Sequence, residues 1–172
     1  MSDVKNLPLI FSRESLHPAA LAHAEQWLAR RPGSAAWGVA FSGGADSLAL
    51  LLTIWALWPG ERARLVALHF THRLRGAESD GDEAFCRALC AELGVSFRAG
   101  KWEQAKADAS EAEARAARLA FFAKVMRTTG ATLLWTGHQK DDVAETLLMR
   151  LARGSGAAGL SAPRPVQSLN DG

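Results

Sequence analysis

Tyrosine is absent from this 172-residue sequence, and cysteine is nearly so, with two residues. Cys86 and Cys90 are four residues apart in a segment with helical periodicity. This spacing is neither a disulfide framework nor the C-x-x-C pattern of redox and zinc sites. We therefore expect both cysteines to be small apolar residues buried on one helical face, and we assign them no chemistry.

Long hydrophobic runs are also lacking. The longest apolar stretch, residues 48–58, is interrupted by Thr53 and is shorter than the roughly 20 residues that a membrane-spanning helix needs. The N-terminus has no basic region followed by an apolar run, so no secretory signal is predicted. We therefore expect a cytoplasmic protein with no membrane partner.

Neither sign of charge is in large excess, because the formal net charge is +2. From Ala114 onward, however, eight Lys and Arg residues accompany four acidic residues, a balance of +4 that leaves −2 for the preceding part. A phosphate-rich partner near the C-terminal third and an ordinary solvated basic face explain this equally well. With 48% apolar and 22% charged residues, the chain is expected to form one packed domain over residues 1–172.

Apolar periodicity and turn residues predict alternating strands and helices. The predicted strands are residues 37–41, 65–70, 95–98 and 133–136, and the predicted helices are residues 16–30, 46–58, 79–93, 111–128 and 141–152. Ser79 and Asp80 are the expected caps of the third helix, and Gly94 follows its end. This alternation indicates an α/β fold, a parallel sheet with helices on both faces.

The segment Ser42-Gly43-Gly44-Ala45-Asp46-Ser47 falls between the first predicted strand and the following helix. In open parallel sheets, this is where a phosphate meets a helix N-terminus. Adjacent glycines let backbone N–H groups approach an anion, and the serine hydroxyls can donate hydrogen bonds. The pattern is neither a Walker A loop, which needs a Lys, nor G-x-G-x-x-G.

Asp46 would be repelled by a bound polyphosphate, so its position suggests a bridging Mg²⁺, which prefers carboxylate and phosphate oxygens. The alternative is an ordinary glycine-rich turn in which Asp46 caps the helix. The apolar strand and helix on either side favour the phosphate loop.

The chain resembles the PP-loop ATP pyrophosphatases and, more narrowly, the tRNA(Ile)-lysidine synthetases. Five landmarks between Val39 and Leu160 carry the resemblance. They are the glycine loop, Leu68-His69-Phe70-Thr71-His72-Arg73-Leu74-Arg75-Gly76, Ala114-Arg115-Ala116-Ala117-Arg118-Leu119, Gly137-His138-Gln139-Lys140-Asp141-Asp142-Val143-Ala144-Glu145-Thr146, and Arg153-Gly154-Ser155-Gly156 with Gly159-Leu160. Leu119 replaces the usual Tyr of the third landmark.

The resemblance implies a Rossmann-like, three-layer α/β/α fold of the adenine nucleotide alpha hydrolase type. It also implies a ligase reaction with ATP and Mg²⁺. ATP adenylates the C2 carbonyl oxygen of the wobble cytidine, residue 34, of a tRNA(Ile) with a CAU anticodon, and the amine of L-lysine displaces AMP to give lysidine. The implied partners are that tRNA and lysine, and a homodimer is left open.

Candidate site residues follow from the loop and the resemblance. The expected catalytic residues are Asp46, Asp141, Asp142 and Glu145, with Asp46 and Asp142 as metal ligands. The expected ATP-binding residues are Phe41, Ser42, Gly43, Gly44, Ala45, Asp46, Ser47, His69, His72, Arg115, His138, Arg153 and Gly154. The expected tRNA or phosphate contacts are Arg118, Arg153 and Ser155. Each of these residues also has a purely structural alternative. The paired aspartates could cap a helix, the histidines could orient loops, and the arginines could lie on a solvent-exposed helix face.

Two departures accompany the resemblance. Lys140 places a cation beside the paired acids. The chain also ends at Gly172, before the fifth strand and the tRNA-binding region of the family, so we expect a fragment that binds ATP weakly and turns over poorly. The remaining alternatives are another PP-loop enzyme, such as a tRNA thiolase, amidotransferase or NAD synthetase, and a non-catalytic nucleotide-binding module.

Overall fold

A computed structural model describes residues 13–15, 18–29, 33, 35–71, 77–102 and 110–137. The chain divides into two compact units, Met1–Thr136 and Gly137–Gly172. All the described residues except Gly137 belong to the first unit. No helix among the described residues is both long and apolar enough to cross a membrane.

Four parallel strands form the sheet, in the spatial order β3-β2-β1-β4. They are β1 (Ala36–Ala40), β2 (Leu65–Thr71), β3 (Ser96–Lys101) and β4 (Ala131–Trp135). The chain proceeds from β1 outward to β3 and then returns to place β4 on the other side of β1. The sheet therefore has a topological switch point at the carboxyl ends of β1 and β4, where such folds bind ligands.

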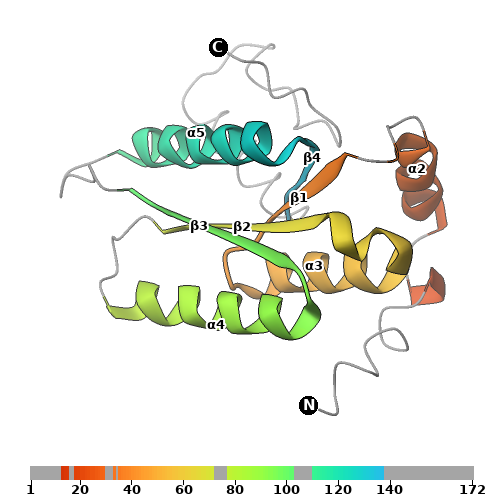
Figure 1. Cartoon of the computed structure of the whole chain (residues 1–172), viewed down its shortest axis with the longest axis horizontal. Helices are drawn as coiled ribbons and strands as arrows, with labels where there is room; N and C mark the ends of the chain where they lie inside the picture. Colours follow the sequence, from red (N-terminus) through yellow and green to blue (C-terminus); the bar gives the residue numbers. More distant parts are fainter. Residues whose placement is uncertain are drawn as a thin grey trace, which may run out of the picture. The chain divides into compact units, whose positions relative to one another are not determined.

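Helices cover both faces of this sheet. The covering helices are α3 (Ala45–Leu57), α4 (Ala77–Leu93) and α5 (Glu111–Thr129). The chain also forms α2 (Pro18–Leu28) and the short 3₁₀ segments η2 (Arg13–Ser15) and η3 (Pro59–Arg64). Figure 1 shows α3 and α4 on one face and α5 on the other. The predicted three-layer α/β/α arrangement with a parallel sheet is confirmed.

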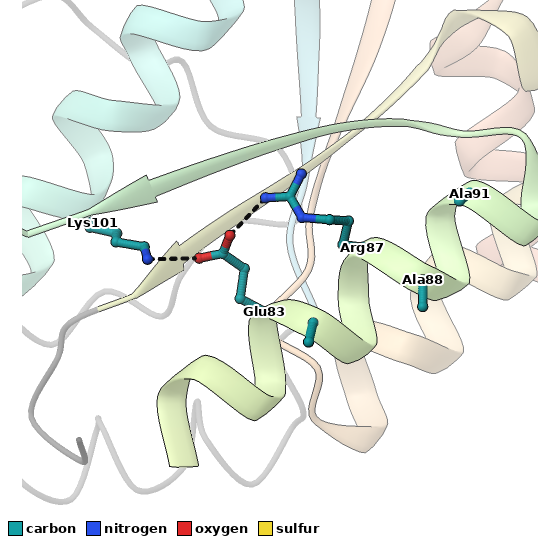
Figure 2. A pocket seen from close by; sticks show the side chains of 6 residues that line it. Glu83, Arg87, Ala88, Ala91 and Lys101 are labelled. Carbon is teal, nitrogen blue, oxygen red and sulfur yellow. Dashed lines mark hydrogen bonds and ion pairs between the residues drawn. The ribbon is translucent and has the colours of Figure 1, made fainter. Parts of the chain in front are cut away.

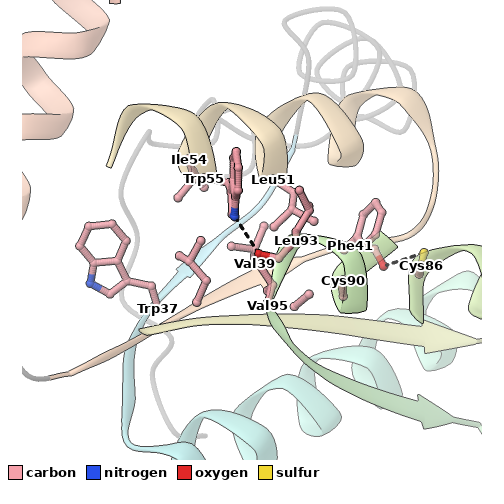
Figure 3. Packing of buried hydrophobic residues seen from close by; sticks show 12 residues of the cluster. Trp37, Val39, Phe41, Leu51, Ile54, Trp55, Cys86, Cys90, Leu93 and Val95 are labelled. Carbon is pink, nitrogen blue, oxygen red and sulfur yellow. Dashed lines mark hydrogen bonds between the residues drawn. The ribbon is translucent and has the colours of Figure 1, made fainter. Parts of the chain in front are cut away.

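Alternation along the strands divides the core into two clusters. On β2, Leu65 and Ala67 pack toward α3 and α4, whereas Val66 and Leu68 pack toward Phe122 of α5. The larger cluster contains Val39 of β1 together with side chains from α3 and α4 (Figure 3). The central strands are buried on both faces of the sheet, which explains why their sequences are continuous hydrophobic runs.

Several element boundaries differ from the predicted ones. The helix α4 begins at Ala77, so the prediction that Ser79 and Asp80 cap it is wrong, and both lie in its first turn. The strand β3 extends to Lys101 because it stays paired with β2 as far as Thr71. The strand β4 begins at Ala131, directly after the left-handed Gly130 that ends α5. The predicted helix 141–152 lies outside the described residues.

A capping box starts α5. The Ser110 hydroxyl accepts a hydrogen bond from the Glu113 N–H, and the Glu113 carboxylate accepts one from the Ser110 N–H. The hydrogen bonds that the Ser110 N–H and the Ser110 hydroxyl donate to the Glu113 carboxylate hold the pKa of Glu113 below its usual value. In Figure 1 this end of α5 lies at the same side of the sheet as the carboxyl ends of the strands.

Candidate functional site

The glycine loop, Phe41–Ser47, follows β1 at the switch point of the sheet and includes the first three residues of α3. Its first residue is tied to the sheet, because the Phe41 N–H donates to the Leu68 carbonyl at 2.9 Å. On the other side of β1, Trp135 at the end of β4 is level with Val39. The loop therefore occupies the position at which an open parallel sheet receives a phosphate group.

Two serine side chains close the loop on itself. The Ser42 and Ser47 hydroxyl oxygens are 3.0 Å apart. The Ser47 hydroxyl also donates to the Gly44 carbonyl at 2.9 Å and accepts from the Ser42 N–H at 3.2 Å. Because the single Ser47 hydroxyl hydrogen is used on Gly44, the Ser42 hydroxyl is the donor between the two serines. This network fixes the loop before any ligand arrives.

The two glycines have different conformational roles. Gly43 has a φ of +94°, in the region that side chains disfavour, whereas Gly44 has a φ of −72°. A Cβ on Gly43 would lie 3.2 Å from the Cys86 Sγ, while a Cβ on Gly44 would meet only the Ser42 hydroxyl at 3.6 Å. A side chain at Gly43 would therefore be crowded by Cys86, whereas a methyl group at Gly44 would make only an ordinary van der Waals contact.

The N-terminus of α3 has the features of an anion-binding site. Gly44 is the N-cap residue of α3, so the alternative reading of Asp46 as that cap is wrong. A glycine offers no side chain to the first N–H groups of the helix, and Ser42, Gly44, Ala45 and Asp46 are all exposed. Exposed N–H groups at the positive end of a helix dipole attract negative charge.

Asp46 lies in the first exposed turn of α3. A single carboxylate next to phosphate oxygens suits Mg²⁺, which is usually held by one or two protein carboxylates and the phosphates of a substrate. Within the described residues, no group of three or more His, Cys, Asp and Glu side chains could form a complete protein cage for a metal. One exposed carboxylate at this position is compatible with metal coordination shared with a nucleotide.

His69 is buried behind the loop, with 3% of its surface exposed. Its Nδ1 is 2.9 Å from the Phe41 carbonyl oxygen, and its Nε2 is 3.1 Å from the Thr71 hydroxyl. Both ring nitrogens are thus used within the protein. In this arrangement His69 reaches the loop backbone from behind.

Arg115 and Arg118 lie in the first turns of α5, three residues apart. The Arg115 side chain is exposed, and Arg118 is partly buried. Burial, and then repulsion from Arg115, lowers the pKa of Arg118. Two neighbouring cations at this end of the sheet remain candidates for phosphate contacts.

Both cysteines are fully buried, as expected, and neither forms a disulfide. Burial raises the pKa of the Cys86 thiol to about 12 and that of Cys90 to about 11. The contact of Cys86 with the loop could not be anticipated, because it joins α4 to a segment more than 40 residues earlier. Long-range contacts of this kind leave no local sequence signal.

All the remaining predicted site residues lie outside the described residues. These are His72, His138, Asp141, Asp142, Glu145, Arg153, Gly154 and Ser155, together with Lys140. Among the predicted site residues, the structure brings His69 into contact with the glycine loop. The contributions of the other residues remain predictions.

A shallow hollow of about 580 Å³ lies elsewhere, between α4 and the edge strand β3. Its lining residues are Glu83, Ala84, Arg87, Ala88, Ala91 and Lys101 (Figure 2). The Glu83 carboxylate binds Arg87 at 2.7 Å and Lys101 at 3.6 Å. None of these residues belongs to the glycine loop or to the predicted site.

The family of the chain follows from comparison with known proteins. A family model described as a PP-loop domain matches residues 18–171. This chain belongs to the PP-loop family, as its motifs predicted.

Within that family, the chain is similar to tRNA(Ile)-lysidine synthases. It is 46% identical over 134 residues to that of Geobacter sulfurreducens, covering 74% of this chain and 28% of the relative. The Chlorobaculum tepidum protein is 40% identical over 127 residues, covering 71% and 38%. The Bradyrhizobium sp. BTAi1 protein is 41% identical over 159 residues, covering 90% and 44%. The chain thus spans less than half the length of these relatives.

Two solved structures share the fold. The U34-tRNA thiolase NcsA from Methanococcus maripaludis matches with a TM-score of 0.60 and 18% identity, over 88% of this chain and 50% of the thiolase. The NH3-dependent NAD synthetase from Campylobacter jejuni matches with a TM-score of 0.51 and 14% identity, over 99% and 69%. At these identities the likeness concerns the fold alone.

Proposed function

We propose that this chain is the ATP-binding part of a tRNA(Ile)-lysidine synthase, with the triphosphate of ATP on the loop Phe41–Ser47. The observation that carries the proposal is the geometry of this loop. It places two glycines and an exposed helix N-terminus at the switch point of a PP-loop fold. Similarity to lysidine synthases over most of the chain supports the choice of reaction.

In the proposed reaction, ATP is split between its α and β phosphates. The C2 carbonyl oxygen of the wobble cytidine of tRNA(Ile) attacks the α phosphate, and pyrophosphate leaves. The ε-amine of L-lysine then attacks C2, AMP leaves, and a proton is lost from the amine. A cytoplasmic location with no membrane partner accords with these substrates.

The loop would stabilise the charge that develops on the leaving pyrophosphate. Backbone N–H groups of the loop and the positive end of the α3 dipole would attract the negative charge of the phosphates. Their advantage is preorganisation, because the Ser42 and Ser47 network already holds the loop in shape. His72, Arg115, His138, Arg153 and Gly154 are proposed as further contacts to ATP, and Arg118, Arg153 and Ser155 as contacts to tRNA or phosphate.

Mg²⁺ would be held by Asp46 and Asp142 and would neutralise phosphate charge when bound. Asp141 and Glu145 are proposed to attract the lysine ammonium group. In sequence, the segment containing these acids follows directly on β4, which ends level with β1.

A thiolase of the two-cysteine type is a weaker alternative. Such chemistry needs accessible thiols, whereas Cys86 and Cys90 are completely buried, and burial raises the pKa of both. Both features disfavour these two cysteines as nucleophiles. A non-catalytic nucleotide-binding module would keep the loop but would have no use for the three acids.

The direct test is incorporation of labelled lysine into transcribed tRNA(Ile) by the full-length protein that contains this sequence. We expect incorporation that requires ATP and is lost in Asp142→Ala. A wild-type protein that binds ATP but incorporates no lysine would remove the substrate assignment. Metal-dependent exchange of labelled pyrophosphate into ATP separates an enzyme from a binding module, because only an enzyme catalyses it.

A further inference from the structure

The rear of the glycine loop is reached by two buried side chains from different elements. His69 of β2 and Cys86 of α4 both approach the carbonyl oxygen of Phe41, His69 through Nδ1 at 2.9 Å and Cys86 through Sγ at 4.0 Å. Figure 3 shows Cys86 directed toward Phe41. Because 3% of His69 and none of Cys86 is exposed, both contacts are shielded from water.

The Phe41 carbonyl fixes the state of the imidazole. A carbonyl oxygen can only accept a hydrogen bond, so the His69 Nδ1 must carry a hydrogen. In the neutral ring Nε2 is then the acceptor, and the Thr71 hydroxyl donates to it at 3.1 Å. The result is a chain of hydrogen bonds from β2 to the first residue of the loop.

Cys86 also touches the next turn of the loop. Its Sγ lies 3.2 Å from the position of a Cβ on Gly43, and the Asp82 carbonyl oxygen lies 3.9 Å from that position. Gly43 is the loop residue with the left-handed backbone, at φ +94°. The helix α4 thus closes the space behind the one loop residue whose conformation is energetically disfavoured for other amino acids.

We propose that His69 and Cys86 are positioning residues that hold the Phe41 carbonyl and the backbone of Gly43 in the conformation that binds the phosphates of ATP. This inference rests on the proposed function. It gives His69 an indirect role, through the loop backbone. It also gives Cys86 a role that does not require a reactive thiol.

Cys90 provides a matched control. It lies one turn further along α4, is equally buried, and belongs to the same hydrophobic cluster. Cys86→Ala and Cys90→Ala remove the same atom from similar surroundings and should cost similar stability. If Cys86 positions the loop, Cys86→Ala weakens ATP binding by about fivefold or more, because small displacements of a binding group are costly. Cys90→Ala should change it by less than about twofold.

His69 allows a rescue experiment. In His69→Asn, the shorter side chain keeps an N–H donor close to the position of Nδ1, whereas His69→Leu keeps bulk without a donor. We expect His69→Asn to retain more ATP affinity than His69→Leu at comparable thermal stability. Equal losses of affinity in the two variants would overturn the role of the hydrogen bond.

A labelling experiment reports on the same contact without enzyme activity. The rate at which iodoacetamide modifies each buried cysteine in the wild-type chain is measured by mass spectrometry, with and without ATP and Mg²⁺. Ligand binding suppresses local opening around its site, so ATP should slow modification of Cys86 more than that of Cys90. Equal protection of both thiols, or equal affinity of the two alanine variants, would overturn the inference.

Measurements of ATP binding distinguish failure of the proposed function from failure of the positioning role. If the wild-type chain binds no ATP in equilibrium dialysis at millimolar nucleotide, both the function and the positioning role are wrong. If it binds ATP and the Cys86 and His69 variants bind as well as Cys90→Ala, only the positioning role is wrong.

Discussion

The hydroxyl oxygens of Ser42 and Ser47 lie 3.0 Å apart across the loop that joins β1 to α3. Ser47 is buried, whereas Ser42 is exposed at the mouth of the loop. This pair links the backbone at the start of the loop to the helix that follows it. The shape of the phosphate-binding segment is therefore a property of the folded chain itself.

Replacement of Ser47 by alanine should loosen this segment. The variant leaves the Ser42 N–H without its partner and removes one of two hydrogen bonds to the Gly44 carbonyl, which still accepts from the Leu48 N–H. The free energy of unfolding should therefore fall by about 1–2 kcal/mol. ATP affinity should fall as well. Urea unfolding and equilibrium dialysis measure the two effects, and Ser96→Ala at the exposed start of β3 is the control. Unchanged ATP affinity in Ser47→Ala would argue against the preorganised loop.

Alanine at Gly43 and alanine at Gly44 should have distinguishable effects. Gly43→Ala forces a side chain into left-handed backbone beside Cys86 and should cost about 1–2 kcal/mol of stability or more. Gly44 has ordinary backbone and open space, so Gly44→Ala should cost less stability. It should nevertheless weaken ATP binding, because a methyl group would stand where phosphate approaches the backbone. Thermal unfolding and ATP titration of both variants test this contrast. The prediction is wrong if Gly44→Ala binds ATP normally.

Gly100 of β3 is predicted to be intolerant of any side chain. A Cβ there would lie 2.4 Å from the Phe121 ring of α5, too close for any real contact. Gly100→Ala should therefore displace Phe121 and lower stability by about 1–3 kcal/mol. Gly81→Ala is the matched control, because Gly81 lies in α4 with nothing near its Cβ position. Alanine there should raise stability by about 0.5–1 kcal/mol. Equal changes in the urea midpoints of the two variants would contradict this packing.

Acid should weaken the contact between α4 and β3. The hydrogen bond from Arg87, aided by the nearby charges of Lys101 and Arg87, holds the pKa of Glu83 below the ordinary value of 4.5. A carboxyl with a lowered folded pKa contributes its full stability above the unfolded value. That contribution is lost as pH falls from 4.5 through the lower folded pKa. We expect the difference in stability between wild type and Glu83→Gln to shrink over that interval. A difference that stays constant from pH 7 to pH 3 would show that the carboxylate pairs contribute nothing.

The strand and helix alternation could be predicted because it depends on local patterns. Runs such as Leu65–Phe70 and the glycine and proline residues after helices are visible in the sequence. The exact ends of strands and helices were harder to predict from the sequence. For example, β3 continues to Lys101 because it stays paired with β2 as far as Thr71. Likewise, Ser79 and Asp80 are good caps by type, yet α4 starts at Ala77. The capping preference of these two residues therefore did not decide where the helix begins.

Of the candidate site, the position of the glycine loop between the first strand and the following helix could be predicted, because the apolar runs on either side of it are visible in the sequence. The supporting contacts could not. Cys86 was expected to be buried, and it is, but its approach to Gly43 depends on how α4 packs against the loop. His69 was expected to bind ATP, which stays a prediction. Its hydrogen bonds to Phe41 and Thr71 could not be predicted from the sequence.

The fate of the α phosphate tests the central claim most directly. The full-length protein is given ATP labelled at that phosphate, together with Mg²⁺, lysine and tRNA(Ile), and the labelled products are separated. If the loop holds the triphosphate for attack on the α phosphate, the label appears in AMP, in step with lysine incorporation, and Gly44→Ala slows both. Label found in ADP, or AMP formed at the same rate by the Gly44 variant, would contradict this account.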